Sequence, residues 1–260
     1  MTGGRLARLW GYAAAGRQSL DDLKRGIQRH WQGFSSGDAD VLSGLMPWET
    51  ALVDRFIPRG SDVLVVGSGS GRDVLALMER GCRVTGIEPS GDAVRIARRV
   101  LSARGLTATL VEGFFEDAVV DGRFDAVMFS FHAYAYVPES RRRIAVLQKA
   151  ASRLKAGGHV LVSHPARMER PLGLFIWIGR LAGALAGADW VIEPGDLIAV
   201  GAGHREAINF VHAFADGELE REAAAAGLPV VFREEFVDDE VIAAALRAPV
   251  SSQTAFPRAR

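Results

Sequence analysis

Three glycines at alternating positions, followed by an acidic residue, form the pattern in this chain that points most directly to ligand binding. Gly67, Gly69 and Gly71 follow a valine-rich apolar run at 63–66, and Glu88 comes about 20 residues after the glycines begin. Such glycines let the backbone turn sharply and leave its N–H groups uncovered by side chains. A carboxylate at this distance can accept hydrogen bonds from ribose hydroxyls. The pattern therefore predicts a site for an adenosine-containing ligand.

The residues around the glycines predict the elements that position them. The apolar run at 63–66 fits a strand that is buried on both faces of a parallel sheet. Apolar residues at helical spacing follow the glycines, and Gly81 stands where a helix C-terminal cap is expected. A second strand at 83–87 then brings Glu88 to its carboxyl end. Ligands of open α/β sheets bind outside that edge.

The glycine spacing separates two classes of cofactor. A dinucleotide fingerprint has its third glycine three positions after the second, and Arg72 occupies that position here. The observed G-x-G-x-G spacing instead resembles motif I of the class I S-adenosylmethionine-dependent methyltransferases. The segment V-T-G-I-E-P-S at 84–90 resembles the acidic motif that follows it in that family. An NAD-dependent oxidoreductase remains the less favoured alternative.

The resemblance implies an α/β fold: a Rossmann-like, seven-stranded, mostly parallel sheet with helices on both faces. Here it would carry N-terminal helices, expected to lie over the cofactor edge, and an insertion after the fifth strand. Later strands are expected at 107–111, 124–130, about 159–163, 229–233 and 241–246, the last of them antiparallel. We expect one methyltransferase domain over 1–260, made of an N-terminal helical segment (1–58), a cofactor-binding core (59–165), a lid or substrate insertion (166–214), the C-terminal part of the core (215–248) and a tail (249–260).

The resemblance also implies the cofactor, S-adenosyl-L-methionine, and the residues that bind it. In this family the glycine loop holds the methionine end and the acidic residue holds the ribose. The family often has an acidic residue near the adenine where this chain has Phe114, so we expect phenylalanine rings there, with Glu116 as a substitute. The expected cofactor-binding residues are Gly67, Ser68, Gly69, Gly71, Glu88, Pro89, Phe114, Phe115, Glu116, Ser130 and Phe131.

Methyl transfer from a sulfonium requires an aligned nucleophile and the exclusion of water. An oxygen or nitrogen nucleophile can need a base, and histidine suits neutral pH. His132 is the first catalytic candidate, with Tyr134 or Tyr136 assisting, because these residues follow the fourth strand, where the methyl group is expected. His164 and His212 come next. A structural role is the alternative for each of them.

No metal site is expected. Cys82 is the only cysteine, and the histidines lack zinc-binding spacing. A single cysteine also fits a reducing, cytoplasmic setting.

An apolar stretch at 172–188 is interrupted only by Arg180. A membrane span needs about 20 residues, so the stretch is short for one. Gly179, Gly183 and Gly187 recur every fourth residue and leave one helical face without side chains, which permits close approach of another helix. We favour a helix that lids the pocket; a packing helix and peripheral membrane contact are the alternatives.

Charge gives no support for a nucleic-acid partner. Lys plus Arg and Asp plus Glu are equal, at 31 each, so there is no overall basic field. The run Arg141 to Arg143 is expected on the solvated face of a helix. The segment 131–138 also lacks the N-P-P-Y-like tetrapeptide that grips a base amine in nucleic-acid amino-methylating enzymes.

The predicted function is methyl transfer to an O or N atom of a small, partly apolar acceptor, by a monomer or homodimer. The alternative is a non-catalytic cofactor-binding or partner module on the same fold. The apolar character of the acceptor is inferred from the aromatic residues Phe131, Tyr134, Tyr136, Phe175 and Trp177.

Overall fold

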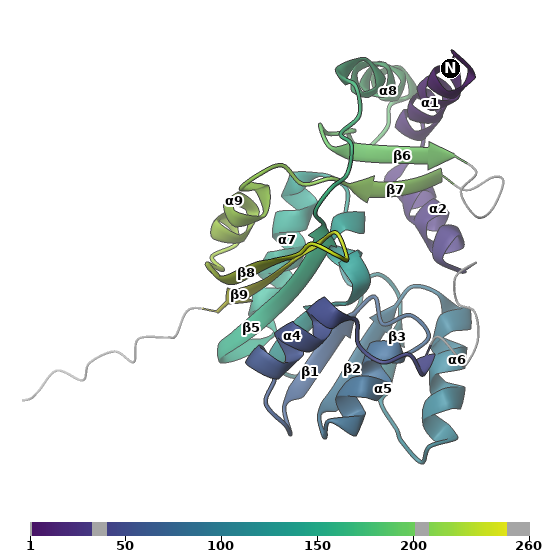
Figure 1. The fold of residues 1–260 in the computed structure, drawn as a ribbon. Helices are drawn as coiled ribbons and strands as arrows, with labels where there is room; N and C mark the ends of the chain where they lie inside the picture. Colours follow the sequence, from purple (N-terminus) through teal and green to yellow (C-terminus); the bar gives the residue numbers. More distant parts are fainter. Residues whose placement is uncertain (1, 33–40, 201–207, 249–260) are drawn as a thin grey trace, which may run out of the picture.

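The computed structural model describes residues 2–32, 41–200 and 208–248 (Figure 1). Its central sheet contains β1 (Asp62–Val66), β2 (Arg83–Glu88), β3 (Thr109–Glu112), β4 (Phe124–Phe129), β5 (Leu154–Pro165), β8 (Val230–Phe236) and β9 (Val241–Arg247). The strand order is β3-β2-β1-β4-β5-β9-β8. β1 to β5 pair in parallel, and β9 runs antiparallel to β5 and β8. The predicted Rossmann-like sheet is confirmed.

Helices cover both faces of this sheet because successive strand residues point to opposite sides. On β1, Val63 and Val65 pack against α4 (Pro47–Phe56), α5 (Arg72–Glu79) and α6 (Gly91–Ser102). Leu64 and Val66 join the opposite core, with α7 (Ser140–Ser152) and α9 (Glu218–Ala225). Both faces of the strand are buried, which explains its continuous apolar sequence.

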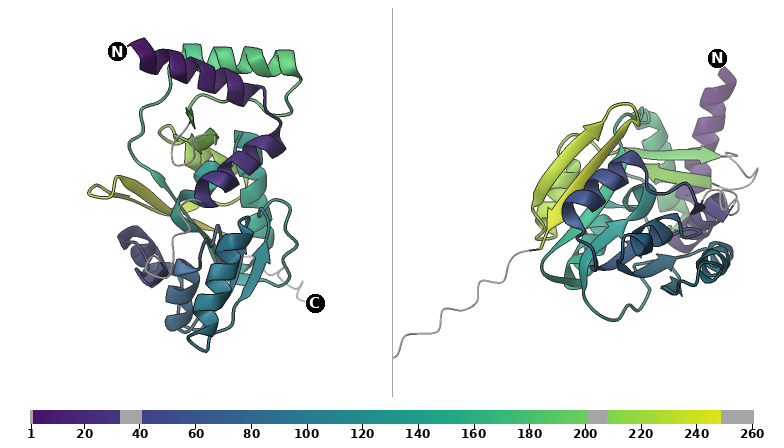
Figure 2. Two further views of the ribbon diagram at one scale, coloured as in Figure 1. Left: turned by 90° about the vertical axis from the view of Figure 1, so that its right-hand side faces the viewer. Right: turned by 60° about the horizontal axis from the view of Figure 1, so that its bottom comes forward.

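A third apolar cluster lies beyond the carboxyl ends of the parallel strands. It combines the N-terminal α1 (Thr2–Gly16) and α2 (Leu20–Gln32) with the insertion, which consists of α8 (Gly173–Ala186) and the antiparallel pair β6 (Asp196–Val200) and β7 (Ile208–His212). Figures 1 and 2 show α1 and α8 side by side at the end of the molecule farthest from α5 and α6. Among the described helices, none has the length and apolarity needed to cross a bilayer. The predicted tail at 249–260 lies outside the described residues.

Glycines set the distance between α1 and α8. A Cβ built on Gly16 would lie 2.1 Å from the carbonyl oxygen of Gly179, and one on Gly183 would lie 2.9 Å from the carbonyl oxygen of Gly16. The close approach of another helix is confirmed for Gly179 and Gly183. Gly187 instead ends α8 in the left-handed conformation.

The favoured prediction is that α8 lids the pocket, but α8 packs on α1 and contributes no residue to the cavity at the glycine loop. Phe175 is buried in the third cluster and Trp177 is exposed.

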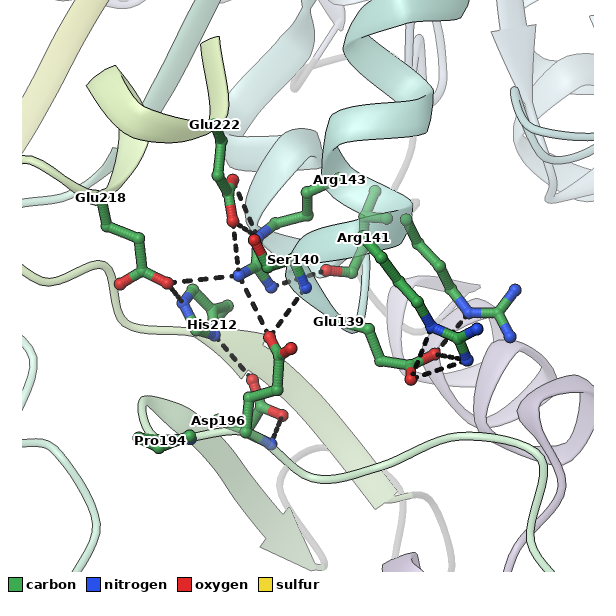
Figure 3. Close-up of polar contacts among 12 residues, drawn as sticks. Glu139, Ser140, Arg141, Arg143, Pro194, Asp196, His212, Glu218 and Glu222 are labelled. Atoms are coloured by element: carbon green, nitrogen blue, oxygen red, sulfur yellow. Dashed lines mark hydrogen bonds and ion pairs between the residues drawn. The ribbon is translucent and has the colours of Figure 1, made fainter. Parts of the chain in front are cut away.

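The prediction that Arg141 to Arg143 form a solvated face is wrong for Arg143. Its side chain is fully buried and pairs with Glu222 of α9, with Nη2 2.8 Å from Oε1 (Figure 3). Arg141 is largely exposed and pairs with Glu139. Consecutive helical residues differ by about 100° in direction, so one residue of such a run can face inward when an acidic partner is present there.

The same network joins the insertion to the core. His212 of β7 lies between Asp196 of β6, 2.7 Å from Nδ1, and Glu218 of α9, 2.9 Å from Nε2. Arg143 Nη2 also lies 3.3 Å from Glu218 Oε1 and from Glu193 Oε2. Figure 3 shows Arg143 of α7 and Glu218 of α9 converging with Asp196 and His212 of the β6–β7 hairpin. The hairpin is therefore held to the core by buried charge pairs.

Candidate functional site

A cavity of about 600 Å³ opens where the carboxyl ends of β1, β2 and β4 meet α2. Its volume is typical of small-molecule sites, which span about 300–1,000 Å³. The structure brings together there ten of the residues predicted to bind the cofactor: Gly67, Ser68, Gly69, Glu88, Pro89, Phe114, Phe115, Glu116, Ser130 and Phe131.

The glycine loop serves both the cavity and the packing behind it. Gly69 has φ 51°, and a Cβ built on it would meet nothing within 4 Å, so its backbone faces open space. Gly71 has φ 95°, and its Cβ would lie 2.9 Å from the Cβ of Ala97 in α6. Gly71 does not line the cavity. Its lack of a side chain allows α6 to pack closely against the loop.

Glu88 lies at the centre of the cavity wall and is 7% exposed. Its Oε2 accepts a hydrogen bond from the Gly69 amide at 2.9 Å, and its Oε1 accepts one from the Ser90 amide at 2.8 Å. Burial raises the pKa of Glu88, and the two amide donors oppose that rise. Each carboxylate oxygen has two lone pairs, so Glu88 retains the capacity to accept hydrogen bonds from a ligand.

A polar cluster that the sequence interpretation missed lies beside the loop. Arg72 Nη2 is 2.8 Å from Glu49 Oε1 and 2.7 Å from Asp73 Oδ1. The Ser130 hydroxyl donates to Asp73 Oδ2. Arg72, Asp73 and Ser130 all line the cavity. The available signal was the position of Arg72 and Asp73, directly after the last glycine at the start of a helix.

The N-terminal helix α2 covers the cavity, as expected from the sequence. Gln28 Nε2 donates to the carbonyl oxygen of Pro89 at 2.6 Å. Lys24 Nζ lies 4.9 Å from the centroid of the Phe114 ring and 3.4 Å from Glu116 Oε1. Residues at helical spacing on one face of α2 line the cavity: Lys24, Ile27, Gln28 and Trp31.

Aromatic side chains form the wall between α2 and the segment after β4. The Trp31 ring centroid lies 5.2 Å from that of Tyr136 and 6.1 Å from that of Phe131, both near perpendicular. All three line the cavity. Burial raises the pKa of Tyr136 to about 12, so its hydroxyl stays protonated at neutral pH.

The structure does not bring His132 to the cavity. Its ring stacks on Trp48, with centroids 5.7 Å apart, and its Nδ1 lies 3.1 Å from Ser163 Oγ. Burial lowers the pKa of His132 to about 4. The cause of this placement is the backbone: Phe131 has φ 37° and His132 has φ 65°. This left-handed turn carries His132 behind the wall, so a catalytic role is not retained.

Tyr134 also lies behind the cavity wall. It is fully buried, and its hydroxyl donates to Glu222 Oε2 at 2.6 Å. His164 is buried with Nδ1 3.0 Å from the carbonyl oxygen of Pro165, and His212 belongs to the ion-pair network. Within the described part of the chain, no histidine lines the cavity.

The segment that contains the glycine loop and Glu88 is similar in sequence to known methyltransferases. Residues 63–158 match the family model described as a methyltransferase domain. The cypemycin N-terminal methyltransferase of a Streptomyces species is 33% identical over 134 residues, which cover 50% of this chain and 52% of that protein. The dTDP-3-amino-3,6-dideoxy-alpha-D-glucopyranose N,N-dimethyltransferase of Streptomyces fradiae is 31% identical over 112 residues, 43% of this chain and 42% of that protein. The chain thus spans about half the length of these relatives.

Solved structures share the fold. An S-adenosylmethionine-dependent methyltransferase from Methanosarcina mazei matches with TM-score 0.60 and 18% identity, covering 80% of this chain and 99% of that one. The glycopeptide N-methyltransferase MtfA in complex with S-adenosylhomocysteine matches with TM-score 0.57 and 19% identity, covering 83% and 94%. The family match includes the glycine loop and Glu88, both on the cavity. Residues 63–158 therefore match the methyltransferase domain family, and the fold of the chain is one that S-adenosylmethionine-dependent methyltransferases of known structure share.

Proposed function

We propose that this chain transfers a methyl group from S-adenosylmethionine to an oxygen or nitrogen atom of a small, partly apolar acceptor. One observation carries the proposal. The aromatic wall of Trp31, Phe131 and Tyr136 belongs to the same cavity as the glycine loop and Glu88. An acceptor resting on those rings would share one enclosed space with the cofactor, as direct transfer requires.

The cavity residues fit the cofactor's chemistry. Glu88 has free lone pairs for the ribose hydroxyls, and the open space at Gly69 lets a ligand approach the backbone closely. In this proposal, Ser68, Gly69 and Ser130 hold the methionine end. Phe114 would lie against the adenine, and Glu116 would lie near the adenine amino group.

Bound S-adenosylmethionine would supply an electrophilic methyl group, and the glycine loop and Glu88 would hold the cofactor in the cavity. The chain's contribution is alignment and the exclusion of water by α2. Since the hydroxyl of Tyr136 stays protonated, it can donate a hydrogen bond that orients the acceptor but is a poor base. His132 packs against the wall from behind, with its ring centroid 4.9 Å from that of Phe131.

Three relatives are named for methylation of nitrogen or oxygen, whereas one from Pyrococcus horikoshii, 40% identical over 70 residues, is named 23S rRNA (uracil(747)-C(5))-methyltransferase. Two are named for an N-terminal and an amino-sugar N,N-methylation. A third, from Xanthomonas axonopodis pv. citri, is named ubiquinone biosynthesis O-methyltransferase and is 28% identical over 172 residues. The equal numbers of acidic and basic residues argue against a nucleic-acid acceptor.

The test begins with calorimetric titration of the protein with S-adenosylmethionine and S-adenosylhomocysteine, with NAD as the control. Methyl-labelled cofactor is then incubated with small aromatic amines, phenols and amino sugars, and with RNA as a contrasting acceptor. We expect cofactor binding and label transfer to a small amine or hydroxyl. Cofactor binding without transfer to any of these would favour a non-catalytic module, and transfer to RNA alone would overturn the proposed acceptor class.

The aromatic wall is tested by Trp31→Ala and Tyr136→Phe. We expect a raised KM for the acceptor with unchanged affinity for S-adenosylhomocysteine. Trp10→Ala is the matched control, because Trp10 is 75% exposed on α1 and does not line the cavity. Unchanged acceptor KM in both wall variants would place the acceptor elsewhere.

A further inference from the structure

The α1–α8 pair exposes large apolar side chains. We call this surface the α1–α8 face. Trp10 is 75% exposed and Trp177 60%, although tryptophan is on average highly buried. The face consists of Leu6, Trp10, Leu174, Trp177, Leu181 and Leu185.

The exposed residues follow the period of the helix. On α8 they recur three or four positions apart from Leu174 to Leu185, opposite the buried Phe175 and Ile176. On α1, Leu6 and Trp10 are one turn apart, and Tyr12 and Ala15 face inward. Each helix therefore has two apolar sides, one packed into the third core and one left on the surface.

The charges on this pair have one sign. α1 carries Arg5 and Arg8, and Arg17 directly follows it. Arg180 of α8 instead donates to the carbonyl oxygen of Ile192 and lines a second pocket together with Glu193. Neither helix contains an acidic residue. The whole chain has no net charge, so this is a local asymmetry. A second copy docking here would bring arginines near arginines without a carboxylate on either helix. An anionic surface would supply the opposite charges that these arginines lack on the two helices.

We propose that the α1–α8 face docks on the surface of an anionic lipid bilayer. Exposed tryptophans and leucines on helices that carry arginines and no acidic residues suit a helix pair that lies in the headgroup region. The leucines would enter the acyl boundary, and the arginines would meet lipid phosphates. This goes beyond methyl transfer and does not depend on the identity of the acceptor.

A short loop connects α1, which is part of this face, to α2, which lines the cavity. α1 ends at Gly16 and α2 begins at Leu20. α2 supplies Lys24 and Trp31 to the cavity wall. A bilayer bound at the α1–α8 face would therefore lie at the same end of the molecule as α2 (Figure 2), the helix that lines the cavity.

The experiment is co-sedimentation of the purified protein with vesicles of phosphatidylcholine alone and of phosphatidylcholine mixed with phosphatidylglycerol. We expect binding to the mixed vesicles that weakens as salt is added. Trp177→Asp should weaken it on the order of tenfold. Arg5→Gln with Arg8→Gln should weaken it roughly fivefold per arginine. Val119→Asp is the matched control, because Val119 is 80% exposed outside this face, and we expect no change.

Two results would overturn the proposal: wild-type protein that fails to bind the mixed vesicles, or binding that Trp177→Asp leaves unchanged. A concentration-dependent dimer that Trp177→Asp abolishes, without vesicle binding, would assign the face to a second copy and also overturn it. Affinity for S-adenosylhomocysteine, measured on the same variants, shows that they are folded. It also separates failure of this proposal from failure of the proposed function.

Discussion

The Gly69 amide donates a hydrogen bond to Glu88 Oε2 over 2.9 Å. The amides of Gly67 and Ser68 donate to the carbonyl oxygen of Ile87 at 2.9 and 3.0 Å. The loop after β1 is thus fastened to the end of β2 before any ligand binds. A loop held in this way loses little conformational freedom on binding, which favours affinity.

Replacing Glu88 with Ala should weaken binding of S-adenosylmethionine about 10- to 100-fold, because charge-assisted hydrogen bonds worth about 1.5–3 kcal/mol are lost. Calorimetric titration measures this directly. Glu112→Ala is the matched control, since Glu112 pairs in register with Glu88 at the end of β3 but does not line the cavity. Equal affinities in wild type and a folded Glu88→Ala protein would contradict the assignment.

The same substitution at two glycines should give different results. Gly71→Ala places a Cβ 2.9 Å from Ala97 Cβ at a positive φ, so it should lower the free energy of unfolding by about 1–3 kcal/mol. Gly69→Ala meets open space and should cost about 1–2 kcal/mol of backbone strain while weakening cofactor binding more strongly. Urea unfolding and calorimetry distinguish the two. A larger affinity loss at Gly71 than at Gly69 would contradict the roles assigned here.

Arg143→Met should lower the free energy of unfolding by about 3–5 kcal/mol, because it leaves the buried carboxylate of Glu222 unpaired. Arg141→Met, two positions earlier on the same helix, should have little effect because the Arg141 side chain is 67% exposed. Urea unfolding of both variants checks the prediction. Similar losses in the two would mean that the buried pair adds no stability beyond a surface one.

Stability should depend on pH through His212. Both ring nitrogens face carboxylates, Asp196 and Glu218, and a neutral imidazole can donate from only one of them. Burial opposes the charged form, but these hydrogen bonds outweigh it and raise the pKa of His212. Its contribution is therefore complete below the unfolded pKa of about 6.5 and is lost as the pH rises through the higher native pKa.

The measurement is urea unfolding of wild type and His212→Gln from pH 6 upward. We expect the wild type to be more stable at pH 6, and the difference to shrink as the pH rises. At low pH the stability also depends on Glu218, the carboxylate that pairs with His212 Nε2. Burial favours protonated Glu218, but hydrogen bonds from His212 and the Ala215 amide lower its pKa to about 2. Its contribution is then lost as the pH falls from about 4.5 toward 2. A difference between the two proteins that grows above pH 6.5 would contradict a charged His212.

The parts of the molecule that were predicted correctly depend on contiguous sequence. Val63–Val66, the alternating glycines and Glu88 lie within one strand, loop, helix and strand, so spacing alone orders them along the sheet edge. The helical periods of α2 and α8 were readable for the same reason. Even the close approach at Gly179 followed from a repeat within one helix.

The direction of a side chain at a junction depended on distant parts of the chain. His132 turns away from the cavity because Phe131 and His132 take left-handed backbone angles, and Trp48 and Ser163 hold the ring there. Arg143 is buried because α9 brings Glu222 to it. The sequence by itself determined the fold, the glycine loop and the position of the acidic residue at the end of β2. The tertiary structure decided which side chains enter the cavity, because packing partners far away in sequence set the orientation of each one.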